Sequence, residues 1–300
     1  MSTTSIVAVS DASITCGAVT FWRLQGEVDL AKLRVGFAAA GLPEEWLPSP
    51  PSSKVALTRA LAAIKTSGKS IVHLKNGGHA VVALRENESE TDLAKRVTAS
   101  ATLTVKLGCN AAEETCLIVD FPENDEQAER DATDVHGLWQ HYCQSVVHGD
   151  ASPWLSQLMT KLDALCLRDG GGVYFVPATH VQTWSKIVTA LASASAYRVS
   201  TIPAMKSDEA VASILAALED EAASHVAAID ALLEADEVGA RAIRNRIKET
   251  DDVAAKLARY EALLGEKLTA MTEKLETTRA SLSLAEMAAM NADESARGAA

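Results

Sequence analysis

The C-terminal third of the chain has the most regular spacing of apolar and polar residues. From residue 207 onward apolar side chains recur at steps of four and three, which is typical of a helix that buries one face against another helix. The pattern falters around Glu237–Gly239 and then returns, and no proline follows Ser207. It predicts a long helical hairpin or a coiled coil over residues 207–290, and a frayed tail over 291–300.

The predicted contact face of these helices, called the seam, is apolar apart from one histidine. A polar residue at such a position lowers stability but can fix the register or the oligomeric state, and a histidine can also act as a pH switch. The seam consists of Val211, Leu215, Leu218, His225, Ile229, Leu232, Leu257, Leu264, Leu268, Met271 and Leu275.

Residues 70–121 have the period-two pattern of strands instead. Apolar residues alternate with polar ones over residues 97–105, and the Asn-Gly-Gly sequence at 76–78 supplies the positive φ angles of a hairpin turn. We predict an antiparallel sheet of about four strands over this segment.

Helix and strand signals flank this sheet on both sides. Residues 18–24 have the composition of a strand, and an amphipathic helix follows before the proline-rich connector PSPPSS. Ser53 is the predicted cap of the next helix. After the sheet, Asn124 is predicted to cap a helix that ends at Gly149, and residues 152–153 (Ser-Pro) begin another.

A glycine run at 170–172 leads into the strand VYFVP, and a helix and the strand YRVSTIP follow. A strand–helix–strand connection of this length places the two strands parallel or adjacent in one small sheet. The whole pattern predicts an α+β fold with a mostly antiparallel sheet and packed helices, followed by the helical hairpin or coiled coil. We divide the chain into an α+β domain (1–150), a small αβαβ unit packed on it (151–206) and the helical segment (207–290).

Composition and charge indicate a soluble protein of a reducing compartment. The chain is 48% hydrophobic with a formal net charge of −12. It has no stretch of roughly 18 apolar residues to span a membrane, and its N-terminus lacks the basic and apolar parts of a signal peptide. The five cysteines include no CxxC pair. We therefore expect a cytoplasmic protein with reduced thiols and no membrane contact.

One concentrated basic segment occurs in this acidic chain. Arg241, Arg244 and Lys248 are spaced to share one helix face, and Arg246 lies beside them. Guanidinium groups bind phosphate or carboxylate in bidentate geometry, so this basic patch is a candidate contact for nucleic acid or another acidic partner. We favour the alternative of a solvated face paired with neighbouring acids, because the net charge is negative and no aromatic residues are interleaved for base stacking.

Other groups of residues have the composition of chemical sites without the required arrangement. The glycine run lacks the GK[ST] of a phosphate-binding loop and indicates a helix C-cap and tight turn. Among His136, His141 and Cys143 only two residues share a helix face, and two ligands do not make a metal site. No GxSxG motif accompanies the serines near His180 and Asp169, so nothing indicates a hydrolytic triad. We assign no catalytic residue, metal or cofactor.

Four segments carry a resemblance to a known family: FWRLQGEVDLAKLRVGFAAAGLPEEWLPSPPSSKVALTRAL, LRDGGGVYFVPATHV, YRVSTIPAMKSDEAV and GARAIRNRIKE. In this order they resemble an uncharacterised family of prokaryotic proteins over most of the chain. The resemblance implies an N-terminal helix-proline block, a glycine-led VYFVP strand and a helical C-terminal region. It implies no activity.

These observations favour a non-enzymatic interaction or scaffold protein that self-associates through its C-terminal helices. The expected partner is a second copy of the chain, and another protein is the next candidate. A nucleic-acid accessory factor that uses residues 241–248 is one alternative. An enzyme with an unrecognised site in the N-terminal region is the other.

Overall fold

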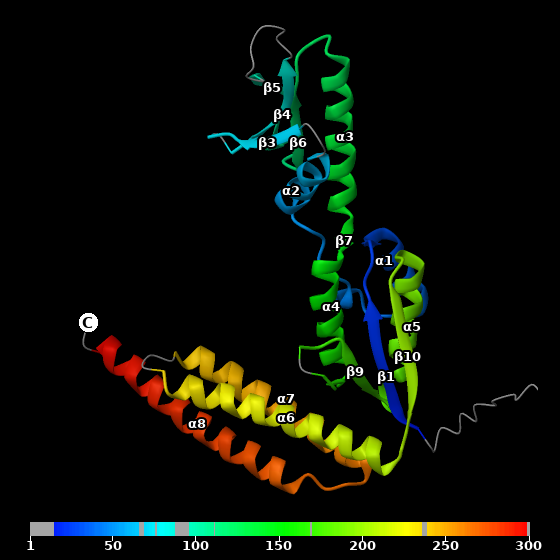
Figure 1. Ribbon diagram of the computed structural model, residues 1–300. Helices are drawn as coiled ribbons and strands as arrows, with labels where there is room; N and C mark the ends of the chain where they lie inside the picture. Colours follow the sequence, from blue (N-terminus) through cyan, green and yellow to red (C-terminus); the bar gives the residue numbers. More distant parts are fainter. Residues whose placement is uncertain are drawn as a thin grey trace, which may run out of the picture. The chain divides into compact units, whose positions relative to one another are not determined.

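The computed structural model describes residues 15–65, 69–75, 77–87, 96–110, 112–168, 170–235 and 239–298. It confirms an α+β fold with antiparallel sheets (Figure 1). The chain forms two compact units, and the predicted domain boundaries at residues 150 and 206 stay predictions. Unit 1 comprises Met1–Arg23, Leu155–Val188 and Arg198–Ala300, and unit 2 comprises Leu24–Trp154 and Thr189–Tyr197.

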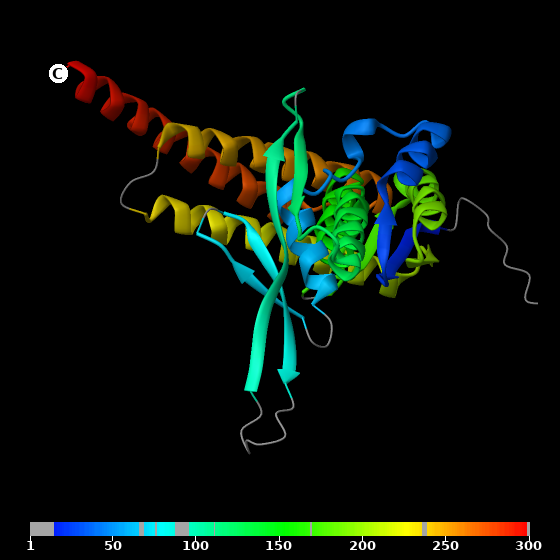
Figure 2. The same cartoon turned by 90° about the horizontal axis from the view of Figure 1, so that it is seen from above.

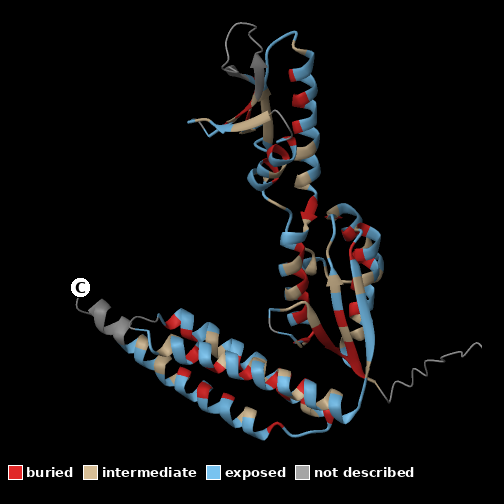
Figure 3. Cartoon of the chain, viewed as in Figure 1, coloured by how far each residue is buried: buried red, intermediate tan, exposed pale blue. Residues whose placement is uncertain are grey.

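The larger sheet of unit 2 consists of β3 (Lys69–His73), β4 (His79–Asn87), β5 (Arg96–Cys109) and β6 (Thr115–Asp120). The strands lie in this order and each is antiparallel to its neighbours, which confirms the predicted sheet. Figure 2 shows β4 and β5 as a pair of long twisted strands. Two helices, α2 (Ser53–Ile64) and α3 (Glu126–Cys143), cover the sheet. Leu57, Val81 and Val135 lie in the shared core, which Figure 3 draws in red.

Two predicted helix caps are wrong by one residue. Helix α2 begins after Ser52, whose Oγ accepts a hydrogen bond from the backbone N–H of Val55, so Ser52 and not Ser53 is the cap. Helix α3 begins after Asp125, and Asn124 precedes the cap with a left-handed φ of 68°. In both cases the neighbouring residue has the same capping chemistry, so the sequence pattern did not separate the two.

The remaining elements of unit 2 are β2 (Glu27–Asp29), α1 (Leu30–Ala40), η1 (Glu44–Trp46), β7 (Ser145–Val147) and the start of α4 (His148–Lys161). The Asp29 carboxylate caps α1, and Gly41 ends it in the left-handed conformation. Strands β2 and β7 pair antiparallel and are too short to show a period in the sequence. Because β7 ends the preceding segment, α4 begins at His148 rather than at Ser152.

The sheet of unit 1 consists of β1 (Thr15–Arg23), β8 (Leu165–Cys166), β9 (Val173–Pro177) and β10 (Arg198–Met205), in the order β10-β1-β9-β8. Strand β1 is antiparallel to both β9 and β10, so these two are parallel but separated by β1. Helix α5 (Ala178–Ala194) connects them. Its fully buried Trp184 donates the indole N–H to Thr20 Oγ1 at 3.0 Å, which fixes the helix to one face of the sheet.

Three C-terminal helices complete unit 1: α6 (Asp208–Leu233), α7 (Ala240–Leu264) and α8 (Thr269–Gly298). They lie side by side as a bundle (Figure 1). The predicted break between α6 and α7 falls partly on residues 236–238, which lie outside the described residues. A second break follows Gly265, so the region has three helices where the sequence predicted two. Within the described residues, no helix combines the length and hydropathy needed to cross a bilayer.

Candidate functional site

The structure places the predicted seam inside a single chain. Leu218, Leu257 and Leu275 are buried in one cluster where α6, α7 and α8 meet. The same cluster includes Phe175 of β9, so the bundle also covers part of the sheet of unit 1. Of the remaining seam residues, Leu264, Leu268 and Ile229 are buried, and Val211, Leu215, Leu232 and Met271 are partly buried. All of these residues except Leu232 belong to a core cluster, so they already have intramolecular partners.

His225, the polar residue of the seam, lies in a hydrogen-bonded chain between α6 and α7. Thr250 Oγ1 donates to the Arg246 carbonyl oxygen at 2.8 Å, and His225 Nε2 lies 3.0 Å from the same Oγ1. Because the only hydroxyl proton of Thr250 is used, the imidazole must be the donor, which places a proton on Nε2. Burial lowers the pKa of His225 below its usual value, and the Arg246 charge adds to this effect, while Glu249 opposes it.

Unit 1 contains a cleft of about 910 Å³ beside these helices. The lining from the end of α4 and the β8–β9 hairpin is called the hairpin wall, and the lining from α6 is called the α6 wall. Lys256 of α7 also lines the cleft. The polar side chains that line the cleft are Ser156, Thr160, Arg168, Tyr174, Ser213, Asp220, Glu221, Ser224 and Lys256.

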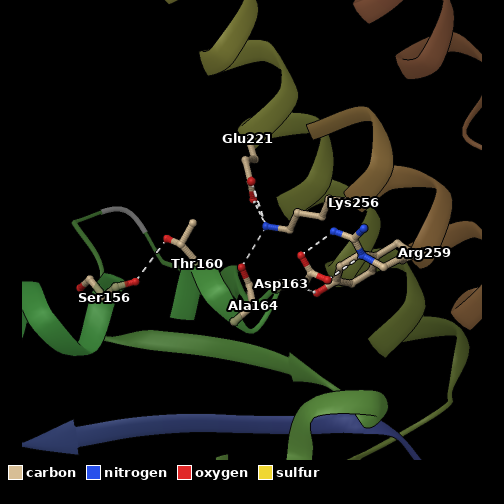
Figure 4. Close-up of polar contacts among 8 residues, drawn as sticks. Ser156, Thr160, Asp163, Ala164, Glu221, Lys256 and Arg259 are labelled. Atoms are coloured by element: carbon tan, nitrogen blue, oxygen red, sulfur yellow. Dashed lines mark hydrogen bonds and ion pairs between the residues drawn. The ribbon is translucent and has the colours of Figure 1, made fainter. Parts of the chain in front are cut away.

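Lys256 connects α7 to α6 and to the turn after α4 (Figure 4). Its ammonium donates to the Ala164 carbonyl oxygen at 3.0 Å and to both carboxylate oxygens of Glu221 at 2.8 Å. The Lys256 side chain is 11% exposed and that of Glu221 39%. All three ammonium protons are therefore directed at protein acceptors, so Lys256 positions α6 against the turn after α4.

Asp163, in the same turn, contacts two further residues of α7, Arg259 and Tyr260. Its carboxylate accepts a hydrogen bond from Arg259 Nη2 at 2.7 Å, and Arg259 Nε forms an ion pair with the other carboxylate oxygen at 2.6 Å (Figure 4). Its carbonyl oxygen accepts from the Tyr260 hydroxyl at 2.7 Å. Burial raises the pKa of Tyr260, and the nearby carboxylates of Glu221 and Asp163 add to the shift, so the phenol stays protonated as a donor. His180 Nε2 lies 3.6 Å from the Asp163 carboxylate.

The hairpin wall of the cleft carries a pair of hydroxyl groups. Ser156 Oγ and Tyr174 Oη are 3.1 Å apart, and the Tyr174 ring stacks on Trp22 with 5.0 Å between ring centroids. The glycine run forms the hairpin turn, with φ angles of 80°, 82° and 90° at residues 170–172. The predicted tight turn is confirmed, but it joins two strands and is not a helix C-cap, because α4 ends at Lys161.

Residues 17–293 match the model of a family of unknown function, DUF6744. The chain belongs to this family. The match confirms the resemblance to an uncharacterised family that the four sequence segments carry. Neither a curated protein nor a solved structure matches the chain. The family description states no activity, so function has to be argued from the residues themselves.

The basic patch lies at the start of α7 and is partly neutralised. Arg244 pairs with Glu286 of α8 at 3.0 Å, and Arg246 pairs with Glu249 at 2.5 Å. Arg241, Arg244 and Lys248 are exposed. The favoured alternative of a solvated, acid-paired face thus has two of its expected contacts, and nucleic-acid binding stays an untested prediction.

The histidines considered as ligands are used elsewhere or lie apart. His141 Nε2 is 2.7 Å from Glu27 Oε2 and 3.3 Å from Ser145 Oγ. Among the described residues, no group of three or more His, Cys, Asp or Glu side chains is placed to hold a metal ion. Sequence reasoning missed the cleft, because Lys256 and Glu221 look like ordinary surface charges in a helical pattern.

Proposed function

We propose that this protein is a non-enzymatic interaction scaffold that self-associates through its C-terminal helices. The observation that carries the proposal is an exposed apolar surface on α8, called the α8 strip: Leu284, Met287 and Met290, which are 65%, 55% and 49% exposed. These residues are spaced by three and lie on neighbouring turns of the helix.

The opposite side of α8 is already occupied. Leu282 is fully buried against Ile229 and Ile243, and Ala285 and Ala289 pack against the same cluster. The α8 strip therefore adds nothing to the fold of the bundle. Exposed apolar residues that are grouped in this way typically mark a contact surface.

A second copy of the chain is the occupant that the charges favour. Between Ala280 and Asn291 the only charged residue is Glu286, and its carboxylate is bound to Arg244 at 3.0 Å. Two α8 strips related by a two-fold axis would thus meet without repulsion between like charges, and one patch serves both partners. Stable interfaces bury about 800 Å² per partner, which three side chains do not reach, so we expect weak, concentration-dependent association.

We also propose that the protein is cytoplasmic. All five cysteines are free thiols, and Cys109 and Cys166 are exposed. Exposed free thiols are typical of a reducing compartment. No chemical step is part of this proposal.

The test is the molar mass of the full chain by light scattering over about a hundredfold range of concentration, since dimer formation follows mass action. We expect the mass to rise with concentration and the double variant Leu284→Glu/Met287→Glu to stay monomeric. Val35→Glu, at an exposed position in α1 with 70% exposure, is the control and should behave as the unchanged protein. A constant monomer mass, or a double variant that still associates, contradicts the proposal.

Point substitutions are preferable to removal of the helices. Truncation before α6 would expose Phe175 and Leu165, which the bundle covers. New association of such a fragment would then report exposed core residues rather than the original interface.

A further inference from the structure

The two walls of the cleft in unit 1 differ in their hydrogen-bonding character. The α6 wall presents the carboxylates of Asp220 and Glu221, and the hairpin wall presents the guanidinium of Arg168. Arg168 and Asp220 are both exposed to solvent. A ligand that spans the cleft therefore meets acceptors on one side and a cationic donor on the other.

Most donor groups in the cleft are already used by the protein. Lys256 directs its three protons at Ala164 and Glu221. The hydroxyl of Thr160 donates to the Ser156 carbonyl oxygen at 3.3 Å, and that of Ser213 donates to the Glu209 carbonyl oxygen at 2.8 Å. The hydroxyls of Thr160 and Ser213 can only accept further hydrogen bonds, and the Lys256 ammonium can accept none, so the cleft favours a ligand rich in donors.

The hydroxyl pair, Arg168 and the exposed hydroxyl of Ser224 on α6 supply the remaining donors. Ser156 and Tyr174 have one proton each, and their mutual hydrogen bond uses one of the two, which leaves one for a ligand. Together with the guanidinium they provide a place for a single anionic group near the hairpin. A bare anion is disfavoured, because the carboxylate of Asp220 lines the same space.

We infer that the cleft binds a small molecule with several hydroxyl groups and one anionic group. The hydroxyls donate to Asp220 and Glu221, and the anionic group accepts from Arg168 and from the hydroxyl pair. The volume of about 910 Å³ lies within the range of ligand sites, about 300–1,000 Å³. This chemistry is shared by sugar phosphates and sugar acids. The inference is independent of self-association through the α8 strip.

Calorimetric titration of the full chain tests the inference with four probes: glucose 6-phosphate, glucuronate, glucose and inorganic phosphate. We expect one of the two anionic sugars to bind. Glucose and phosphate should bind at least about tenfold more weakly, because glucose lacks the anionic group and phosphate lacks the sugar hydroxyls. Tighter binding of glucose 6-phosphate identifies the anionic group as a phosphate, and tighter binding of glucuronate identifies it as a carboxylate. Absence of binding by both anionic sugars at about 10 mM overturns the inference.

Variants then locate the binding. Arg168→Ala and Asp220→Asn should each lower the affinity for the sugar at least about tenfold. Ala216→Trp should block binding, because it fills the cleft without a change of charge. Arg198→Ala on β10 and Asp230→Asn on α6 are exposed, matched controls that should leave binding unchanged. Thermal unfolding verifies that each variant is folded. Binding that survives Ala216→Trp in a folded protein overturns the assignment to this cleft.

Discussion

At the scale of single residues, the ion pair of Lys256 and Glu221 is asymmetric. The ammonium is nearly buried, whereas the carboxylate is partly open to the cleft. A buried charge that loses its partner is strongly destabilising, while a partly exposed charge can be solvated by water. Loss of the carboxylate should therefore harm the fold more than loss of the ammonium.

We predict that Glu221→Ala lowers the free energy of unfolding by about 2–4 kcal/mol and Lys256→Met by about 1–2 kcal/mol. Urea denaturation measures both, and the double variant should lose less than the sum. Asp251→Ala is the matched control on α7, since its pair with Arg279 is half exposed on both sides, and it should change stability by less than about 1 kcal/mol. A loss for Glu221→Ala no larger than that of the control would show that Lys256 is solvated.

His225 gives a prediction about pH. Its pKa in the folded protein is lower than the usual 6.5, mainly because of burial, so the unfolded chain binds the proton more readily. The stability that this residue contributes is complete above pH 6.5 and is lost as the pH falls through the lowered pKa. Glu249 and Glu221 oppose the shift, and Arg246 supports it.

The melting temperature should accordingly fall more steeply below pH 6.5 for the unchanged protein than for His225→Gln, whose amide can still donate to Thr250. His148→Gln, at an exposed position, serves as the control and should keep the original pH profile. If the melting temperature changes with pH in the same way for all three proteins, His225 does not contribute to the pH dependence of stability.

At the scale of elements, the C-terminal helices show what an apolar period can and cannot reveal. The period identified Leu218, Ile229, Leu257 and Leu264, which are buried, but it missed the buried Ile214 and Val226 of α6. It states only that one face is covered and not whether the cover comes from the same chain. It also hid the break before α8, because Leu264, Leu268 and Met271 keep the helical spacing across it. Gly265, left-handed with φ 77°, was the available signal.

The inner seam and the outer α8 strip differ in their expected effect on stability. Leu218→Ala should lower the free energy of unfolding by about 2–5 kcal/mol, because the side chain is buried in the bundle cluster. Leu284→Ala should change it by less than about 0.5 kcal/mol at concentrations where the chain is monomeric. Chemical denaturation of the two variants side by side checks this contrast, and a large loss for Leu284→Ala would mean that the strip packs within the chain.

At the scale of the whole molecule, the sequence predicted local elements better than their partners. The four-stranded antiparallel sheet of unit 2 consists of strands that are consecutive in the chain, so neighbours in sequence are neighbours in space. The sequence did not predict the cleft of unit 1, because its lining comes from α4, the β8–β9 hairpin, α6 and α7. Each segment has an ordinary local pattern, and only their packing brings the hydroxyls and charges together.

The central position of β1 has a consequence for biosynthesis. Thr15–Arg23 is synthesised before its neighbours Val173–Pro177 and Arg198–Met205, which follow about 150 residues or more later. At bacterial or eukaryotic elongation rates of about 5–20 residues per second, the nascent strand waits on the order of ten seconds for its first partner. During that interval Trp22 lacks its stacking partner Tyr174, so we expect a chaperone that shields this side chain to raise the yield of folded protein.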